Sequence, residues 1–208
     1  MPTLNAMILQ TNDYEQAFES WLAENGVQHV AIDQARRSQL ARNRIKTFDF
    51  LVYPAARTGV FGSGVRGGGC PAVVIAEVKG RQFKGKTLRG RPALQCWVTM
   101  EDVQGLLAWQ RRFDEPGELA QAVFVFAFRL ELPIVETDGL EVYEFGDARY
   151  FFRAVAVDDY CRHMRTRSAR WQTVMLGAGD FRRLAVDVRG LLTRTECKGR
   201  TPCPTQTV

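Results

Sequence analysis

Apolar residues follow two spacings along the chain, one typical of strands and one typical of helices. Two segments, 46–53 and 73–80, are short runs rich in β-branched and aromatic residues, which favours strands. The segment 12–22 instead has its apolar residues at helical spacing and is followed by Asn25-Gly26, where we expect the helix to end. The pattern up to residue 130 predicts helices over 12–22 and 99–112, and strands over 27–32, 46–53, 73–80 and 122–128.

The pattern changes after residue 130. Apolar runs predict strands over 140–145 and 150–157 with Gly146-Asp147 in the turn between them, and Asp158-Asp159 is expected to begin a short helix that ends near Arg167. A last strand is expected over 171–176 and a last helix over 181–192. We therefore expect a core over 1–130, an α+β elaboration over 131–195 packed on the same domain, and a disordered tail over 196–208.

Ionisable residues interrupt two of the expected strands. Side chains alternate along a strand, so Glu77 and Lys79 should project from the same face. Asp49 has a similar place in its own strand, with Phe48 and Phe50 expected on the opposite face. Burying an acid and a lysine at one spot costs desolvation energy unless something compensates their charges. A divalent metal ion and a phosphate would do so.

An Asp on one strand followed by Glu-x-Lys on the next resembles the PD-(D/E)xK nuclease superfamily, which has the restriction-endonuclease-like fold. The order α-β-β-β-α-β, with Gln104 on the second helix, is most similar to the archaeal Holliday-junction resolvase branch. The resemblance covers about residues 12–130. It implies an α/β fold with a central mixed β-sheet flanked by helices. The sequence departs from the family in having Phe48 where the name-giving proline would stand, and in the long segment between Asp49 and Glu77.

The resemblance also implies an activity, Mg²⁺- or Mn²⁺-dependent hydrolysis of DNA phosphodiester bonds in repair, recombination or defence. Lys79 would orient the attacking water and neutralise developing charge, and Gln104 would place Lys79 or the phosphate. Glu15 would reach the metal from the first helix. On this resemblance the metal ligands are Asp49, Glu77, the Val78 carbonyl and Glu15, and the catalytic residues are Asp49, Glu77, Lys79, Glu15 and Gln104.

Each of these residues also has a structural interpretation. Glu15 follows Asn12 at capping-box spacing, and Glu19 is the alternative helix-borne acid. Gln104 can be an ordinary polar residue of its helix. Asp49 and Glu77 can be a surface pair on an edge strand, and Lys79 can simply be the partner of Glu77.

The chain is basic, with a net charge of +5 and a pI near 9.1, which suits a polyanionic partner. Basic residues gather in 36–44 and in the Gly-punctuated segment 80–91, which is expected to be either a flexible arm that contacts phosphates or a solvated loop. The GxGxxG match at 62–67 lacks the helix that a dinucleotide site needs. The expected nucleic-acid contacts are Arg36, Arg37, Arg81, Lys84 and Lys86.

DNA is therefore the expected partner, with RNA as an alternative, and homodimerisation is expected by analogy with the family. A catalytically inactive nucleic-acid-binding protein of the same fold is the alternative function. No apolar run approaches the roughly 18 residues of a membrane span, and the first residues do not resemble a signal peptide, so a cytoplasmic location is expected. The five cysteines lack metal-ligand spacing and are expected to be free thiols.

Overall fold

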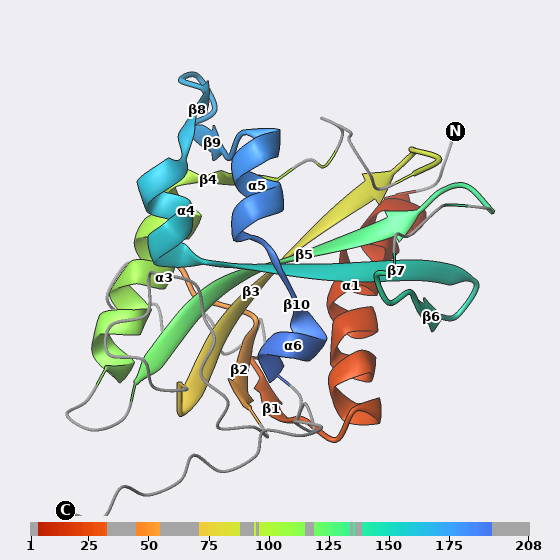
Figure 1. Ribbon diagram of the computed structural model, residues 1–208, viewed down its shortest axis with the longest axis horizontal. Coiled ribbons are helices and arrows are strands. Elements are labelled where there is room, and N and C mark those ends of the chain that lie inside the picture. Colours follow the sequence, from red (N-terminus) through yellow and green to blue (C-terminus); the bar gives the residue numbers. More distant parts are fainter. Residues whose placement is uncertain are drawn as a thin grey trace, which may run out of the picture.

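A seven-stranded mixed sheet forms the centre of the protein, with helices on both of its faces (Figure 1). The computed structural model describes residues 4–32, 45–54, 71–87, 94, 96–114, 119–133, 135 and 139–192, with side chains from residue 13 onward. The expected α/β class, with a central mixed sheet flanked by helices, is confirmed for this part of the chain.

The strand order in the central sheet is β1-β2-β3-β5-β7-β10, and β6 forms a hairpin with β7. Neighbouring strands are antiparallel except β3 and β5, which pair in parallel over eleven register positions. The strands are β1 (Gln28–Ala31), β2 (Phe50–Tyr53), β3 (Val73–Phe83), β5 (Ala120–Leu130), β6 (Tyr143–Phe145), β7 (Ala148–Ala156) and β10 (Val186–Asp187).

One face of the sheet is covered by α1 (Leu4–Glu24) and α6 (Val188–Leu192). Phe18 and Trp21 of α1 are fully buried there against Phe50 and Phe152 of the sheet. The helix ends as expected, because Gly26 adopts a positive φ of 65° that a residue with a side chain rarely takes.

The opposite face is covered by α3 (Met100–Phe113), α4 (Val157–His163) and α5 (Ala178–Leu184). Aromatic residues of β5 fill this core, since Phe124 and Phe126 pack against Tyr160 of α4 and Phe128 packs against Phe181 of α5. A second, three-stranded sheet of order β4-β9-β8 lies on this side, formed by β4 (Trp97–Thr99), β9 (Thr173–Met175) and β8 (Arg165–Ser168).

The expected loop after Gly80 is wrong in its first part. The strand β3 continues to Phe83 because β5 pairs with it along its whole length, up to Phe83 opposite Leu130. Backbone hydrogen bonds to a long neighbour thus outweigh the weak strand propensity of a basic, glycine-containing segment.

The expected helices after residue 157 are also wrong in extent. The first ends at His163, and Arg165–Ser168 form β8 instead. The expected helix over 181–192 is divided into α5, the short strand β10 and α6. Because β7 and β10 belong to the central sheet, the segment after residue 130 completes that sheet as well as covering it.

No helix among the described residues is both long and apolar enough to cross a lipid bilayer. Cys96 and Cys161 are free thiols. The GxGxxG match at 62–67, Arg36, Arg37, the tail 196–208 and the cysteines at 70, 197 and 203 lie outside the described residues.

Candidate active site

A cavity of about 400 Å³ lies where β3 extends beyond the start of β2. Residues 50–52 of β2 pair with residues 74–76 of β3. From Glu77 onward, β3 therefore has no partner residue in β2. The cavity is lined by Tyr14, Glu15, Lys46, Asp49, Glu77, Val78, Lys79, Gly80, Arg81, Trp97, Val98, Thr99 and Asp102.

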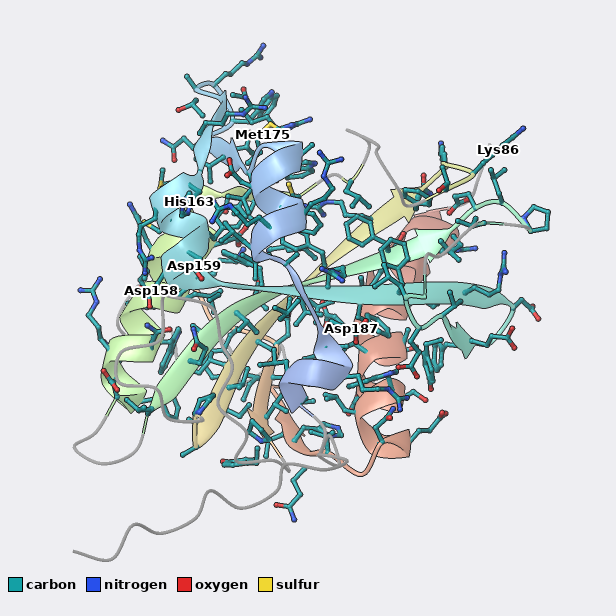
Figure 2. The ribbon with its side chains drawn as sticks, in the orientation of Figure 1. Lys86, Asp158, Asp159, His163, Met175 and Asp187 are labelled. Atoms are coloured by element: carbon teal, nitrogen blue, oxygen red, sulfur yellow. The ribbon has the colours of Figure 1, made fainter. Side chains whose placement is uncertain are left out.

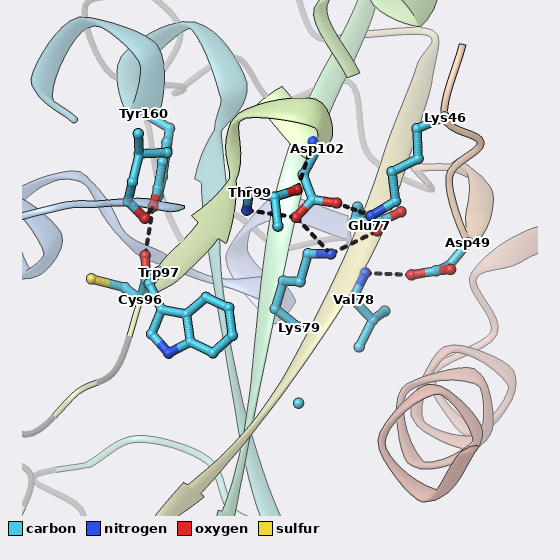
Figure 3. Close-up of polar contacts among 12 residues, drawn as sticks. Lys46, Asp49, Glu77, Val78, Lys79, Cys96, Trp97, Thr99, Asp102 and Tyr160 are labelled. Atoms are coloured by element: carbon cyan, nitrogen blue, oxygen red, sulfur yellow. Dashed lines mark hydrogen bonds and ion pairs between the residues drawn. The ribbon is translucent and has the colours of Figure 1, made fainter. Parts of the chain in front are cut away.

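Asp49 lies at the edge of the cavity, immediately before β2. Its backbone N–H donates to the Ala76 carbonyl at 3.0 Å, and its Oδ2 accepts the Val78 N–H at 2.7 Å (Figure 3). The Asp49 carboxylate thus accepts a hydrogen bond from the β3 backbone at the point where the pairing of β2 with β3 ends. This side chain is buried, with 4% of its surface exposed.

The expectation that Phe48 and Phe50 share a face is wrong. Phe48 packs on Trp109 of α3, with ring centroids 5.3 Å apart, whereas Phe50 packs on Phe18 of α1. The regular alternation fails because the strand begins only at Phe50, and the chain before Asp49 turns toward α3.

Glu77 and Lys79 project from the same face of β3, as the alternation predicts. Lys79 Nζ donates to Glu77 Oε1 at 2.8 Å (Figure 3). Glu77 is buried, and 15% of the Lys79 side chain is exposed. Both lie on the side of the sheet that α3 covers.

Asp102, at the start of α3, completes this group and was missed by the sequence analysis. Its Oδ2 lies 3.1 Å from Lys79 Nζ, and its Oδ1 accepts a hydrogen bond from Lys46. The helix cap fixes this carboxylate, because Thr99 Oγ1 accepts the Asp102 N–H while Asp102 accepts the Thr99 N–H. The Thr-x-x-Asp spacing signals the cap, but no sequence signal connects it to Lys79.

Lys46 is the second residue that the sequence analysis missed. Its Nζ lies 3.8 Å from Glu77 Oε1 and also bonds Asp102, so two carboxylates and two ammonium groups alternate around the cavity wall. The backbone there is tied to α3, since Trp109 donates its indole N–H to the Lys46 carbonyl at 2.9 Å. We call Lys46, Glu77, Lys79 and Asp102 the four-charge cluster.

Burial and charge give these groups unusual acidities. Burial, together with repulsion from Asp49, raises the pKa of Glu77 to about 7, although Lys79 and Lys46 act in the opposite direction. Burial would also raise the pKa of Asp102, but Lys79 and Lys46 outweigh it and lower that pKa. Burial lowers the pKa of Lys79, yet Glu77 and Asp102 raise it overall. With a pKa of about 7, Glu77 exchanges its proton near neutral pH.

The structure brings Glu15 to the cavity but not Gln104. Glu15 lines the cavity from α1, whereas Glu19, the alternative helix-borne acid, lies 3.9 Å from the His29 ring and outside the lining. Gln104 is exposed on α3 and does not line the cavity. Asp102, two residues earlier on the same helix, contacts Lys79 in its place.

Arg81 is part of the cavity wall, and the expectation of a flexible arm at this position is wrong. Its guanidinium donates to the carbonyls of Gly80 and Trp97 and lies 4.3 Å from the centre of the Trp97 ring. Burial lowers the pKa of Arg81 to about 10. Lys84 and Lys86 are exposed just beyond the end of β3. In Figure 2, Lys86 lies well away from the second sheet, which is marked there by Met175 of β9.

The donor atoms at the cavity suit a hard divalent cation bound by a small number of protein groups. Within the described ranges, no three His, Cys, Asp or Glu side chains are grouped as metal ligands. Asp49 and Glu77 are nevertheless two buried carboxylates, and burial together with repulsion from Asp49 raises the pKa of Glu77. Carboxylates with a backbone carbonyl such as that of Val78 are oxygen ligands of the kind Mg²⁺ binds, and Mg²⁺ commonly keeps several waters.

Comparisons with protein-family models, with curated proteins and with solved structures find no match for this chain. The site's own geometry and chemistry are thus what indicate its function.

Proposed function

We propose that the protein is a metal-dependent nuclease of the PD-(D/E)xK type, with a restriction-endonuclease-like core, that hydrolyses DNA phosphodiester bonds in repair, recombination or defence. One observation carries the proposal: Asp49, Glu77 and Lys79 line one cavity, with both carboxylates buried and Lys79 bonded to Glu77. Such a group of charges is costly in a protein interior and is typical of catalytic sites.

The order of the elements supports this proposal. Along the chain α1, β1, β2 and β3 are followed by α3 and β5, and the four strands lie side by side as β1-β2-β3-β5. This is the α-β-β-β-α-β order that the resemblance implies, with the short β4 inserted before α3. A homodimer, expected by analogy, would place two such sites on the two strands of a duplex.

The residues of the cavity divide the chemical work. Lys79, with its ammonium at the cavity wall, holds a phosphate oxygen and orients the attacking water. Asp102 positions Lys79, since it contacts the ammonium and is itself fixed by the helix cap. Asp49, Glu77 and the Val78 carbonyl would hold Mg²⁺, and Glu15, which lines the same cavity, would be a further ligand from α1. The bound cation supplies a Lewis acid for the phosphate and lowers the pKa of its water.

A cleavage assay tests the proposal. Linear duplex, single-stranded, flap and four-way-junction DNA, with matched RNA strands, are incubated with Mg²⁺ or Mn²⁺. We expect metal-dependent cleavage that falls about 10²–10³-fold in both Asp49→Asn and Lys79→Met. Glu101→Gln, an exposed acid of α3, is the matched control and should retain activity. Preferential cleavage of the RNA strands would make the protein an RNA-directed nuclease.

An inactive nucleic-acid-binding protein of the same fold is the second candidate. It is favoured by the four-charge cluster, in which Lys79 is already paired with two carboxylates. Retained DNA binding without cleavage of any substrate, and without Mn²⁺ binding at Asp49 and Glu77, would decide for this candidate.

A further inference from the structure

The hairpin formed by β8 and β9 is a basic projection of the second sheet. Residues 162–176 contain four arginines and no acidic residue. Arg165, Arg167 and Arg170 are exposed, and within the described part of the chain none of the three has a carboxylate partner. The hairpin extends beyond α4 and α5 at one end of the molecule (Figure 1).

Trp171 lies in the turn of this hairpin with 67% of its surface exposed. Among the described residues, Val30 and Tyr53 are the other exposed large apolar side chains, and they lie on β1 and β2. The next residue, Gln172, has a positive φ of 46°, which is uncommon for a residue other than glycine. The Arg170 guanidinium lies 5.1 Å from the Trp171 ring centre. An exposed indole beside a guanidinium offers a ring face on which a nucleic-acid base can stack.

The hairpin is connected to the cavity through Trp97. A bulge between Thr166 and Ser168 interrupts the pairing of β8 with β9, and such bulges redirect the intervening side chain. The Arg167 guanidinium lies 4.9 Å from the centre of the Trp97 ring, and the Arg81 guanidinium lies 4.3 Å from it. Since Trp97 and Arg81 line the cavity, positive charge extends from the cavity wall to the hairpin.

We propose that the β8–β9 hairpin binds the nucleic-acid strand next to the cleaved phosphate, with its arginines on phosphates and Trp171 stacked on an unpaired base. The identity of the ligand rests on the nuclease function proposed above. Arginine and an aromatic ring together match a single strand, where phosphates and exposed bases alternate. The preferred substrate is therefore single-stranded or branched DNA with an unpaired base beside the cut, in preference to continuous duplex.

Binding is measured by fluorescence anisotropy on the full chain in EDTA, so that no cleavage occurs, with a labelled single strand and a fully paired duplex. Trp171→Ala should weaken binding to the single strand at least fivefold and binding to the duplex much less, and Trp171→Phe should restore most of the loss. Arg165→Gln/Arg170→Gln should reduce the dependence of log affinity on log salt by about 0.7 per arginine for the single strand. The control is Arg111→Gln/Arg112→Gln, which removes the same charge from two exposed arginines in the last turn of α3. It should leave the difference between single strand and duplex unchanged.

Unchanged single-strand affinity in Trp171→Ala, or an equal loss on single strand and duplex, would overturn the inference. So would a hairpin that binds phosphatidylserine vesicles and not DNA, because the surface would then be a membrane contact. These binding results do not depend on cleavage. The hairpin can therefore fail its test while Asp49→Asn and Lys79→Met still abolish metal-dependent cutting, and the nuclease can fail while the hairpin binds DNA.

Discussion

The ammonium of Lys79 lies 3.1 Å from the carboxylate of Asp102, which joins the middle of the central sheet to the first turn of α3. Asp102 also accepts hydrogen bonds from Lys46 and from the Thr99 N–H. One carboxylate thus fixes two lysines and one helix end. The loss of Asp102 should therefore lower the stability of the protein and, if Lys79 acts in the proposed nuclease, its catalysis as well.

Asp102→Asn should lower the free energy of unfolding by about 2–4 kcal/mol, because it leaves two partly buried ammonium groups short of a counter-charge and weakens the cap. The proposed nuclease activity should fall through kcat more than through KM. Urea denaturation and steady-state kinetics measure the two effects. Gln104→Ala, on the exposed side of the same helix, is the matched control and should change neither. A larger catalytic loss in the control would return the positioning role to Gln104.

The acidity of Glu77 should make stability depend on pH. Its pKa of about 7 in the folded protein lies above the ordinary value of 4.5, so between these values the folded chain binds a proton that the unfolded chain has released. The free energy of unfolding should therefore fall as pH rises from about 4.5 to about 7, by up to about 3 kcal/mol from this group. Glu77→Gln should remove this contribution, and urea denaturation at pH 5 and pH 8 measures it. If the free energy of unfolding changed with pH equally in Glu77→Gln and in the unaltered protein, the raised pKa would not belong to Glu77.

Divalent cations should stabilise the protein through Asp49 and Glu77. At ten times its Kd, Mg²⁺ or Mn²⁺ should add about 1.4 kcal/mol to the free energy of unfolding. At a fixed metal concentration the effect should be larger at pH 8 than at pH 6, because the deprotonated form of Glu77 is the ligand and the Kd is therefore lower at pH 8. Thermal denaturation with added metal or EDTA measures it. Asp49→Asn should lose most of the stabilisation. If the metal raised the Tm of this variant as much as that of the unaltered protein, the cation would bind elsewhere.

A side chain at position 80 should destabilise the protein. A Cβ at this position would lie 2.4 Å from Cδ2 of the Tyr14 ring, so the ring and the adjoining part of α1 must move. Gly80→Ala should cost about 1–3 kcal/mol in urea denaturation. Combining it with Tyr14→Ala should cost less than the sum of the two single changes.

Gly179→Ala is the control for Gly80→Ala. A Cβ there meets no atom within 4 Å, and the residue lies in α5, so the change should stabilise the protein by up to about 1 kcal/mol. A neutral Gly80→Ala would show that α1 is not held against β3 as described.

The sequence predicted the parts of the fold that depend on short-range pattern. The helix before β1, the strand over 73–80 and the shared face of Glu77 and Lys79 follow from periodicity alone, and each is present, although the helix begins at Leu4 and not at residue 12. The end of β3 did not follow, because eleven paired positions with β5 decide it and Arg81 is accommodated by the Trp97 ring. The split of the last helix depends likewise on a long-range partner, since β10 pairs with β7.

The residues of the candidate site could be predicted from the sequence only in part, because some of them are brought together by long-range contacts. Asp49, Glu77 and Lys79 stand out as charges within apolar runs, but Lys46 and Asp102 lie where charge is unremarkable, one before a strand and the other in a helix cap. Only the three-dimensional packing of α3 against β3 brings these two residues to Lys79 and Glu77.

The late start of β2 has a consequence for how the cavity can be altered. The opening lies where β3 continues past the start of β2, so main chain as well as side chains bounds it. Extending the pairing by two residues past Asp49 would fill the gap with main chain and withdraw the Asp49 carboxylate from the Val78 N–H. The length of β2 is therefore a control on access to the site that also sets the position of the Asp49 carboxylate.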